Sequence, residues 1–227
     1  MAPTLAYWDI RGLAQPIRLL LHYTETEFED KYYVRGPPPT HDRSCWTSVK
    51  ESLGLDFPNL PYYIEGDIRI TQSNAIMRFV ARTGENLEGK TPKEKVRVDM
   101  LENQAMDFRN DFVNLTYMSH NFEEDEVKYI ENLPRKLKQF SDFLAQNKWF
   151  AGENITFVDF IMYELLDQHR MFKAGCLDGF ENLKDLLHRF EEIPQIKSYM
   201  KSNNFIRKRA TTERRFLALR LDNAGLQ

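Results

Sequence analysis

Residues 54–63 and 71–73 carry backbone groups that suit a small peptide ligand. The segment Phe-Pro-Asn-Leu-Pro at residues 57–61 predicts a short extended backbone whose edge polar groups are free. Pro61 is a candidate for a cis peptide bond, which holds a turn that a trans bond does not allow. Residues 71–73 stand at the expected start of a helix, where unpaired N–H groups and a partial positive charge favour a carboxylate. A fixed strand edge beside an anion-binding helix start indicates a peptide site.

Short strands and helices in the first third of the chain must position this site. A helical pattern follows Pro16, since proline is accepted in the first turn of a helix. The prolines at residues 37–39 exclude regular structure there. The other patterns predict strands at residues 4–7 and 28–34, a hairpin of residues 62–64 and 68–70, and a helix at residues 73–83. The order β-α-β, loop, β-β-α resembles a thioredoxin-like fold.

The chain becomes helical after residues 84–92, which contain two glycines and one proline. Spacings of 4, 3 and 4 predict one face of a long helix at Leu101, Ala105, Phe108 and Phe112. Further helices are expected at residues 133–145, with Pro134 in the first turn, and near residues 183–191 and 195–200. We expect an α/β thioredoxin-like domain at residues 1–84, a linker at 85–92 and an all-α helical domain at 93–227.

Thr156 and Asp159 have the spacing of a capping box, in which each side chain bonds the backbone of the other residue. Ile155 and Phe160 are placed to form the accompanying hydrophobic staple. Residues 157–166 are apolar almost all round, which predicts a central, buried helix.

Composition limits the class of protein. Apolar residues make up 42% of the 227 positions, enough for a substantial core, and a net charge of −3 argues against a chain that mainly coats nucleic acid. No apolar run approaches the roughly 20 residues that span a bilayer. The first residues do not resemble a signal peptide, because they lack a basic start and meet a charge at Asp9. Cys45 and Cys176 form no motif, so we expect reduced thiols and a cytoplasmic protein.

Six segments together resemble the cytosolic glutathione transferases, and most closely the mu class. They occur in the family's order between Tyr7 and about Phe205, and they read YWDIRGLAQPIRLLL, DRSCW, GLDFPNLPYY, ITQSNAI, RVDMLENQAMD and WFAGENITFVDF. The resemblance implies a thioredoxin-like domain followed by an all-helical domain, which agrees with the division above. The loop at residues 36–42 falls where the mu class has an additional loop beside its active site.

The resemblance makes Tyr7 the catalytic residue, whose hydroxyl donates a hydrogen bond to the glutathione sulfur. A free thiol with a pKa of about 8.5 is only ~3% thiolate at pH 7. A hydrogen bond to a charged group contributes about 1.5–3 kcal/mol, and each 1.36 kcal/mol shifts a pKa by about one unit. One such bond therefore makes thiolate a major species. The competing interpretation is an ordinary strand tyrosine with a solvated hydroxyl.

Further positions match the family's glutathione site. Trp46 and Lys50 offer donor-only groups for the glycyl carboxylate, whereas Arg43 is expected to shape the loop. The backbone at Asn59 and Leu60 matches the segment that pairs with the cysteinyl unit as an added strand would. The complete predicted set is Trp8, Leu13, Arg43, Trp46, Lys50, Asn59, Leu60, Gln72, Ser73 and Asp107. The alternatives are a turn residue at Asn59 and a simple N-cap at Ser73.

The resemblance also implies a homodimer. Asp107 matches a carboxylate that reaches the γ-glutamyl amino group from the partner subunit, although a solvated helix charge is the commoner fate of a lone Asp. Phe57 matches an aromatic side chain that inserts into the neighbouring subunit. The alternative for Phe57 is a local core residue.

An apolar pocket should receive the electrophile. The matching positions are Ile10, Leu13, Asn110, Tyr117 and Thr212. Tyr117 is placed to assist the transition state as a proton or hydrogen-bond donor. Two features depart from the mu class: Asn110 stands where an apolar residue is usual, and the basic tail after Phe205 is longer than in the class. The family's substrate range therefore does not carry over.

We expect a transferase that conjugates glutathione to hydrophobic electrophiles, a detoxification reaction. Glutathione is a co-substrate, and no metal or bound cofactor, nucleic acid or membrane is implied. A non-catalytic binding protein for apolar ligands and a glutathione-dependent isomerase are the alternatives. A thioredoxin-like redox enzyme requires a cysteine at the start of the first helix, and residues 8–16 contain none.

Overall fold

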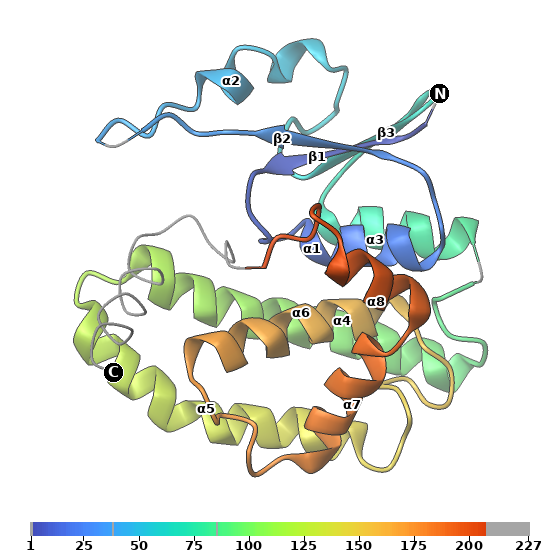
Figure 1. The fold of residues 1–227 in the computed structure, drawn as a ribbon, viewed down its shortest axis with the longest axis vertical. Helices are drawn as coiled ribbons and strands as arrows, with labels where there is room; N and C mark the ends of the chain where they lie inside the picture. Colours follow the sequence, from blue (N-terminus) through green and yellow to red (C-terminus); the bar gives the residue numbers. More distant parts are fainter. Residues whose placement is uncertain (1, 38, 85, 208–227) are drawn as a thin grey trace. The chain divides into compact units, whose positions relative to one another are not determined.

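A four-stranded mixed sheet forms the centre of the N-terminal unit. The computed structural model describes residues 2–37, 39–84 and 86–207 (Figure 1). β1 (Thr4–Trp8) pairs in parallel with β2 (Glu29–Tyr33) and antiparallel with β3 (Tyr62–Glu65), and β4 (Ile68–Thr71) pairs with β3. The strand order is β2-β1-β3-β4. The predicted thioredoxin-like arrangement is confirmed.

Helices cover this sheet. α1 (Gln15–Tyr23) and α3 (Ser73–Thr83) lie side by side on one face, and the short α2 (Ser44–Thr47) lies on the other (Figure 1). Pro16 occupies the first turn of α1, and residues 15–21 of that helix are buried. α3 has the bounds that the sequence predicts. The site residues of this unit therefore stand on strand ends and helix starts around one sheet.

The last described helix packs with the sheet unit. α8 (Pro194–Lys201) contacts α1, and the ring of Tyr199 stacks on His22 with the centroids 3.8 Å apart. The described residues accordingly form two compact units, residues 2–86 with 194–207 and residues 87–193. Residues 194–207 thus group with the α/β unit, whereas the expected division assigned them to the helical domain. The pattern of a short amphipathic helix does not reveal which unit it contacts.

The helical unit contains α4 (Pro92–Val113), α5 (Phe122–Leu144), α6 (Phe157–Phe172) and α7 (Glu181–Glu191). α6 contacts both α4 and α7 and is buried over most of its length, which confirms the predicted central helix. Capping boxes start two of these helices: Thr91 with Glu94 at α4, and the predicted Thr156 with Asp159 at α6. The staple of Ile155 and Phe160 stays a prediction.

The predicted start of α5 was wrong. The helix begins at Phe122, and Pro134 lies inside it instead of in its first turn. Three acidic residues in the first turn favour this earlier start, because they face the positive end of the helix dipole. The buried face that includes Leu133 and Leu137 then holds the helix together across the proline.

Within the described residues, no helix is long and apolar enough to cross a membrane.

Candidate active site

Tyr7 lies near the end of β1, with its side chain 6% exposed. The loop that follows β1 passes directly over the hydroxyl end of its ring. A Cβ atom at Gly12 would lie 2.8 Å from the hydroxyl oxygen and 2.7 Å from Cε1, and Gly12 has a φ of +43°. Only glycine fits this close approach and this left-handed backbone without strain. Sequence reasoning missed Gly12, although a glycine shortly after a strand was the available signal.

The structure gathers five of the other predicted residues around Tyr7. Tyr7, Ile10, Trp46 and Leu60 belong to one buried cluster, and Trp8 and Leu13 pack against it. Trp46 stacks on Tyr62 with the ring centroids 6.0 Å apart. Burial raises the pKa of the Tyr62 hydroxyl, which stays protonated at neutral pH. A predominantly apolar environment of this kind strengthens any electrostatic interaction made inside it.

Trp8 has an unpredicted cationic neighbour. The guanidinium of Arg35 lies 4.8 Å from the centre of the Trp8 ring, in the geometry of a cation–π contact. Arg35 is half-buried, and its Nε has no hydrogen-bond partner among the described residues. Arg35 therefore brings a positive charge to the edge of the predicted glycyl end of the site.

The residues around α2 have different environments. Arg43 is exposed, and its carbonyl accepts the N–H groups of Trp46 at 3.0 Å and Thr47 at 2.9 Å, so Arg43 starts α2. Lys50 is partly exposed, and its Nζ lies 3.4 Å from the carboxylate of Glu51. An ion pair this exposed is weak, so the ammonium of Lys50 is available to an anionic ligand.

The segment before β3 has the predicted cis peptide bond between Leu60 and Pro61. Leu60 is buried, whereas Asn59 is exposed. The Oδ1 atom of Asn59 accepts the N–H of Leu60 at 2.9 Å. A ligand that pairs with this N–H must therefore displace the Asn59 side chain.

The start of α3 is shaped by Gln72, not by a side-chain cap. Gln72 is the N-cap residue, with a φ of +72°, and its carbonyl accepts the N–H of Ile76 at 3.0 Å. Ser73 is therefore the first helical residue and not the N-cap that was one alternative, and it is buried. A left-handed backbone costs a non-glycine residue about 1–2 kcal/mol. Strain of this kind is found where a structure holds a functional group in place.

Three predicted residues belong to the helical unit. Asp107 and Asn110 are exposed on α4, and Tyr117 is half-buried in the π-helical turn Asn114–Met118. Arg109 donates from Nη1 to the Oδ1 of Asn110 at 3.5 Å. Thr212 and most of the basic tail lie outside the described residues.

Phe57, in the N-terminal unit, is 73% exposed, the highest value among the exposed large hydrophobic side chains of the described residues. Among the same residues, no group of three His, Cys, Asp or Glu side chains could hold a metal ion.

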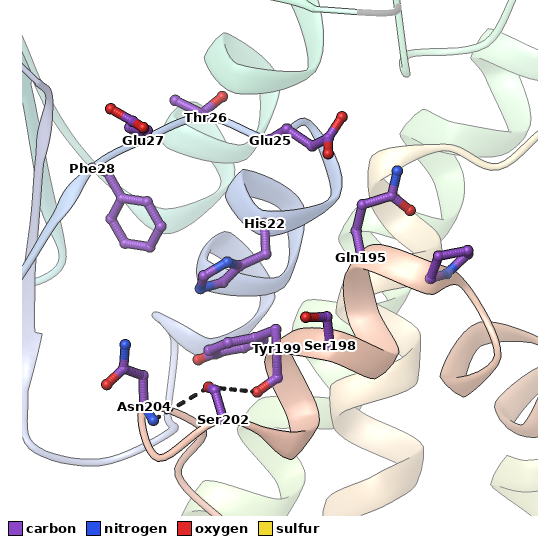
Figure 2. A pocket seen from close by; sticks show the side chains of 11 residues that line it. His22, Glu25, Thr26, Glu27, Phe28, Gln195, Ser198, Tyr199, Ser202 and Asn204 are labelled. Carbon is purple, nitrogen blue, oxygen red and sulfur yellow. Dashed lines mark hydrogen bonds between the residues drawn. The ribbon is translucent and has the colours of Figure 1, made fainter.

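A separate cavity of about 680 Å³ lies beside α1 and α8 in the N-terminal unit (Figure 2). The Phe28 ring points toward the imidazole of His22 there, and burial lowers the pKa of His22, with Asp30 opposing it. The lining consists of His22, Glu25, Thr26, Glu27, Phe28, Pro194, Gln195, Ser198, Tyr199, Ser202 and Asn204. None of these residues is in the predicted glutathione site.

Comparison with known proteins identifies the family. The models of the glutathione S-transferase N-terminal and C-terminal domains match residues 3–82 and 106–203. Glutathione S-transferase Mu 2 of Mus musculus is 55% identical over 208 residues, which cover 92% of this chain and 94% of that protein. Glutathione S-transferase Mu 5 of Homo sapiens is 55% identical over 207 residues, covering 91% and 94%. The crystal structure of the glutathione S-transferase Blo t 8 has a TM-score of 0.81 and 35% identity, covering 88% of this chain and 92% of that one.

The fold and these matches show that the chain belongs to the glutathione S-transferase family. Within that family its relatives are of the Mu class, as the sequence resemblance predicted.

Proposed function

We propose that Tyr7 stabilises the glutathione thiolate that this Mu-class transferase conjugates to hydrophobic electrophiles. The observation that carries the proposal is the buried cluster around Tyr7, which the loop at Gly12 holds against the end of β1. A hydroxyl at that position donates to the sulfur and favours the thiolate over the thiol. The thiol proton passes to solvent. The sulfur lone pair then forms the C–S bond while the leaving group departs with its bonding electrons.

The tripeptide is proposed to lie along the residues named for it. Lys50, the Trp46 indole and Arg43 stand at the glycyl end, and the backbone at Asn59 and Leu60 pairs with the cysteinyl unit. Gln72, Ser73 and the free N–H groups at the start of α3 receive the γ-glutamyl carboxylate. Trp8 is proposed to stand at the same glycyl end, and Leu13 completes the set named for glutathione. The site binds and orients glutathione as a co-substrate and requires no metal.

The electrophile is proposed to bind at Ile10, Leu13, Asn110, Tyr117 and Thr212, with Tyr117 able to donate a hydrogen bond to it. An electrophile with a hydrogen-bonding group suits Asn110 better than a purely apolar one. We also propose that the enzyme is cytoplasmic and serves detoxification.

A homodimer is proposed, in which Phe57 anchors the interface and Asp107 of one subunit completes the partner's site. A large aromatic side chain that is 73% exposed gains stability when it enters a pocket. Phe57→Ser should therefore shift the dimer toward monomer in analytical ultracentrifugation. An unchanged dimer would remove Phe57 from the interface.

The test of the proposed function is conjugation of glutathione to an activated aryl chloride at about pH 6.5, where free glutathione is mostly thiol. Tyr7→Phe should lower turnover by about tenfold or more, since one charge-assisted hydrogen bond is worth about 1.4 kcal/mol or more. Equal turnover in native enzyme and variant would reject Tyr7 as the donor. Tight glutathione binding without turnover in the native chain would favour a binding protein or an isomerase.

A further inference from the structure

Arg18, on α1, is fully buried and connects three parts of the N-terminal unit. Its Nε donates to the Oδ2 of Asp30 on β2 at 2.8 Å. Its Nη1 donates to the carbonyl of Ile10 at 3.0 Å and to the Oε1 of Gln15 at 3.4 Å. Tyr32 also donates its hydroxyl to Asp30. One guanidinium therefore holds β2, α1 and the loop between β1 and α1.

The buried ion pair of Arg18 and Asp30 leaves some of its polar atoms without hydrogen bonds. Among the described residues, the Nη2 of Arg18 and the Oδ1 of Asp30 have no hydrogen-bond partner. Buried charges lose hydration, and the loss is offset only when each polar atom is bonded. Stability alone is thus a poor explanation for an arginine at this position. The hydrogen bond from Arg18 to the Ile10 carbonyl suggests a more specific reason for this arginine.

Ile10 lies in the loop that contacts the hydroxyl of Tyr7. The close approach to the Tyr7 ring occurs at Gly12, two residues farther along the same loop. The N–H of Ile10 donates to the carbonyl of Trp8 at 2.7 Å, so the backbone is fixed on the strand side as well. A displacement of the carbonyl at Ile10 therefore moves the backbone that borders the Tyr7 hydroxyl.

The same group of side chains extends to α8. Gln15, which accepts from Arg18, donates from Nε2 to the hydroxyl of Tyr199 at 3.4 Å. Tyr199 in turn stacks on His22, as Figure 2 shows beside the cavity. Arg18 is thus held from the sheet and from its own helix, and Gln15 links it to α8, so it is a rigid support for the loop.

We propose that Arg18 is a positioning residue for catalysis: it holds the Ile10 carbonyl so that the loop sets the Tyr7 hydroxyl at the glutathione sulfur. The proposal rests on the proposed function, in which Tyr7 is the donor to the thiolate. Arg18 itself does not touch the substrate.

Arg18→Lys is the variant that tests it. Lysine keeps the charge but lacks the planar fork that binds Asp30 and Ile10 at once. The pKa of enzyme-bound glutathione, followed by the ultraviolet absorbance of the thiolate, should rise by about half a unit. The rate below that pKa should then fall about threefold. The glutathione Kd should stay within about twofold, because the variant changes the thiol pKa but not the residues that bind the tripeptide.

Arg97→Lys is the matched control. Arg97 also donates to backbone carbonyls, that of Phe143 at the end of α5 and that of Phe150, but in the helical unit. Arg97→Lys should lower the thermal midpoint of unfolding and leave the pKa of the bound glutathione thiol unchanged. Asp30→Asn provides a second disruption of the same contacts if Arg18→Lys does not fold, and it should raise the thiol pKa in the same direction. If Arg18→Lys and Asp30→Asn lower only the thermal midpoint, the positioning role is overturned.

Tyr7→Phe separates this inference from the proposed function. If Tyr7→Phe raises the thiol pKa and Arg18→Lys does not, only the role of Arg18 fails. If Tyr7→Phe leaves the pKa unchanged, the donor role of Tyr7 fails, and the role of Arg18 fails with it. When both are correct, Tyr7→Phe combined with Arg18→Lys shifts the pKa no further than Tyr7→Phe alone.

Discussion

The loop after β1 and the turn before α6 each hold a buried polar side chain against backbone, but they do so by opposite means. At Gly12 the backbone approaches Tyr7 because a side chain is absent. Before α6 the carboxylate of Asp159 is fully buried and accepts the N–H of Phe150 at 2.9 Å and the N–H of Thr156 at 2.8 Å. The first arrangement should govern chemistry, and the second should govern stability.

The largest effect is expected at the turn before α6. Asp159→Ala leaves the N–H groups of Phe150 and Thr156 and the Thr156 hydroxyl without their acceptor. It should lower the free energy of unfolding by about 3–5 kcal/mol, measured by urea denaturation. Asp142→Ala, which removes an exposed carboxylate paired with Lys138, should change it by only about 0.5 kcal/mol. Similar losses in the two variants would contradict the role given to Asp159.

The second effect is the pH dependence of stability that a buried histidine causes in the helical unit. Burial lowers the pKa of His169 to about 4, while its bond to the Leu165 carbonyl opposes the shift. In the unfolded chain His169 takes up a proton at about pH 6.5, whereas in the folded protein it does so only at about pH 4. Stability is therefore lost as the pH falls from about 6.5 to about 4. This contribution reaches about 3 kcal/mol at the acid end.

His169→Gln removes the titrating group and leaves an acceptor for the Tyr129 hydroxyl, which bonds the His169 Nε2 at 2.7 Å. Urea denaturation at several pH values should show a shallower loss of stability at acid pH in this variant. Identical pH profiles in the two proteins would assign the acid sensitivity to the carboxylates.

The smallest expected energy change is at Gly12, and it is an effect on catalysis. Gly12→Ala places a methyl group against the Tyr7 hydroxyl and should lower kcat/KM at least tenfold, or about 1.4 kcal/mol. Gly66→Ala provides the control, because Gly66 also has a positive φ, +57°, but no atom lies within 4 Å of the added Cβ. Equal kinetics in the two alanine variants would show that contact with the Tyr7 hydroxyl does not govern catalysis.

Regular patterns made most of the fold predictable. Strand patterns indicated the sheet, the helical period indicated α4, and an almost wholly apolar segment indicated the buried α6. The start of α5 was predicted 11 residues too late, since a proline signals a helix start more often than an interior position. The contact between α8 and α1 depends on tertiary packing that no local pattern records.

The candidate site was predictable only where a motif marks it. Tyr7, Trp46 and Leu60 came from the resemblance, and the structure gathers them into one cluster. The φ of +72° at Gln72 has no signature in its residue type, since glutamine rarely adopts that backbone. The burial of Arg18 was also unpredictable, because a charged residue on an amphipathic helix is normally exposed. These features follow from long-range contacts.

The packing of α8 against α1 has a consequence for how the protein is made. Gln15 and Tyr199 are hydrogen-bonded although 184 residues separate them in the chain. A ribosome adds roughly 5–20 residues per second, so Gln15 waits roughly 10 to 40 seconds after its own synthesis for Tyr199. During that interval the face of α1 around His22 lacks its cover. A nascent chain truncated before residue 194 should therefore bind chaperones through this face, even though its sheet is complete.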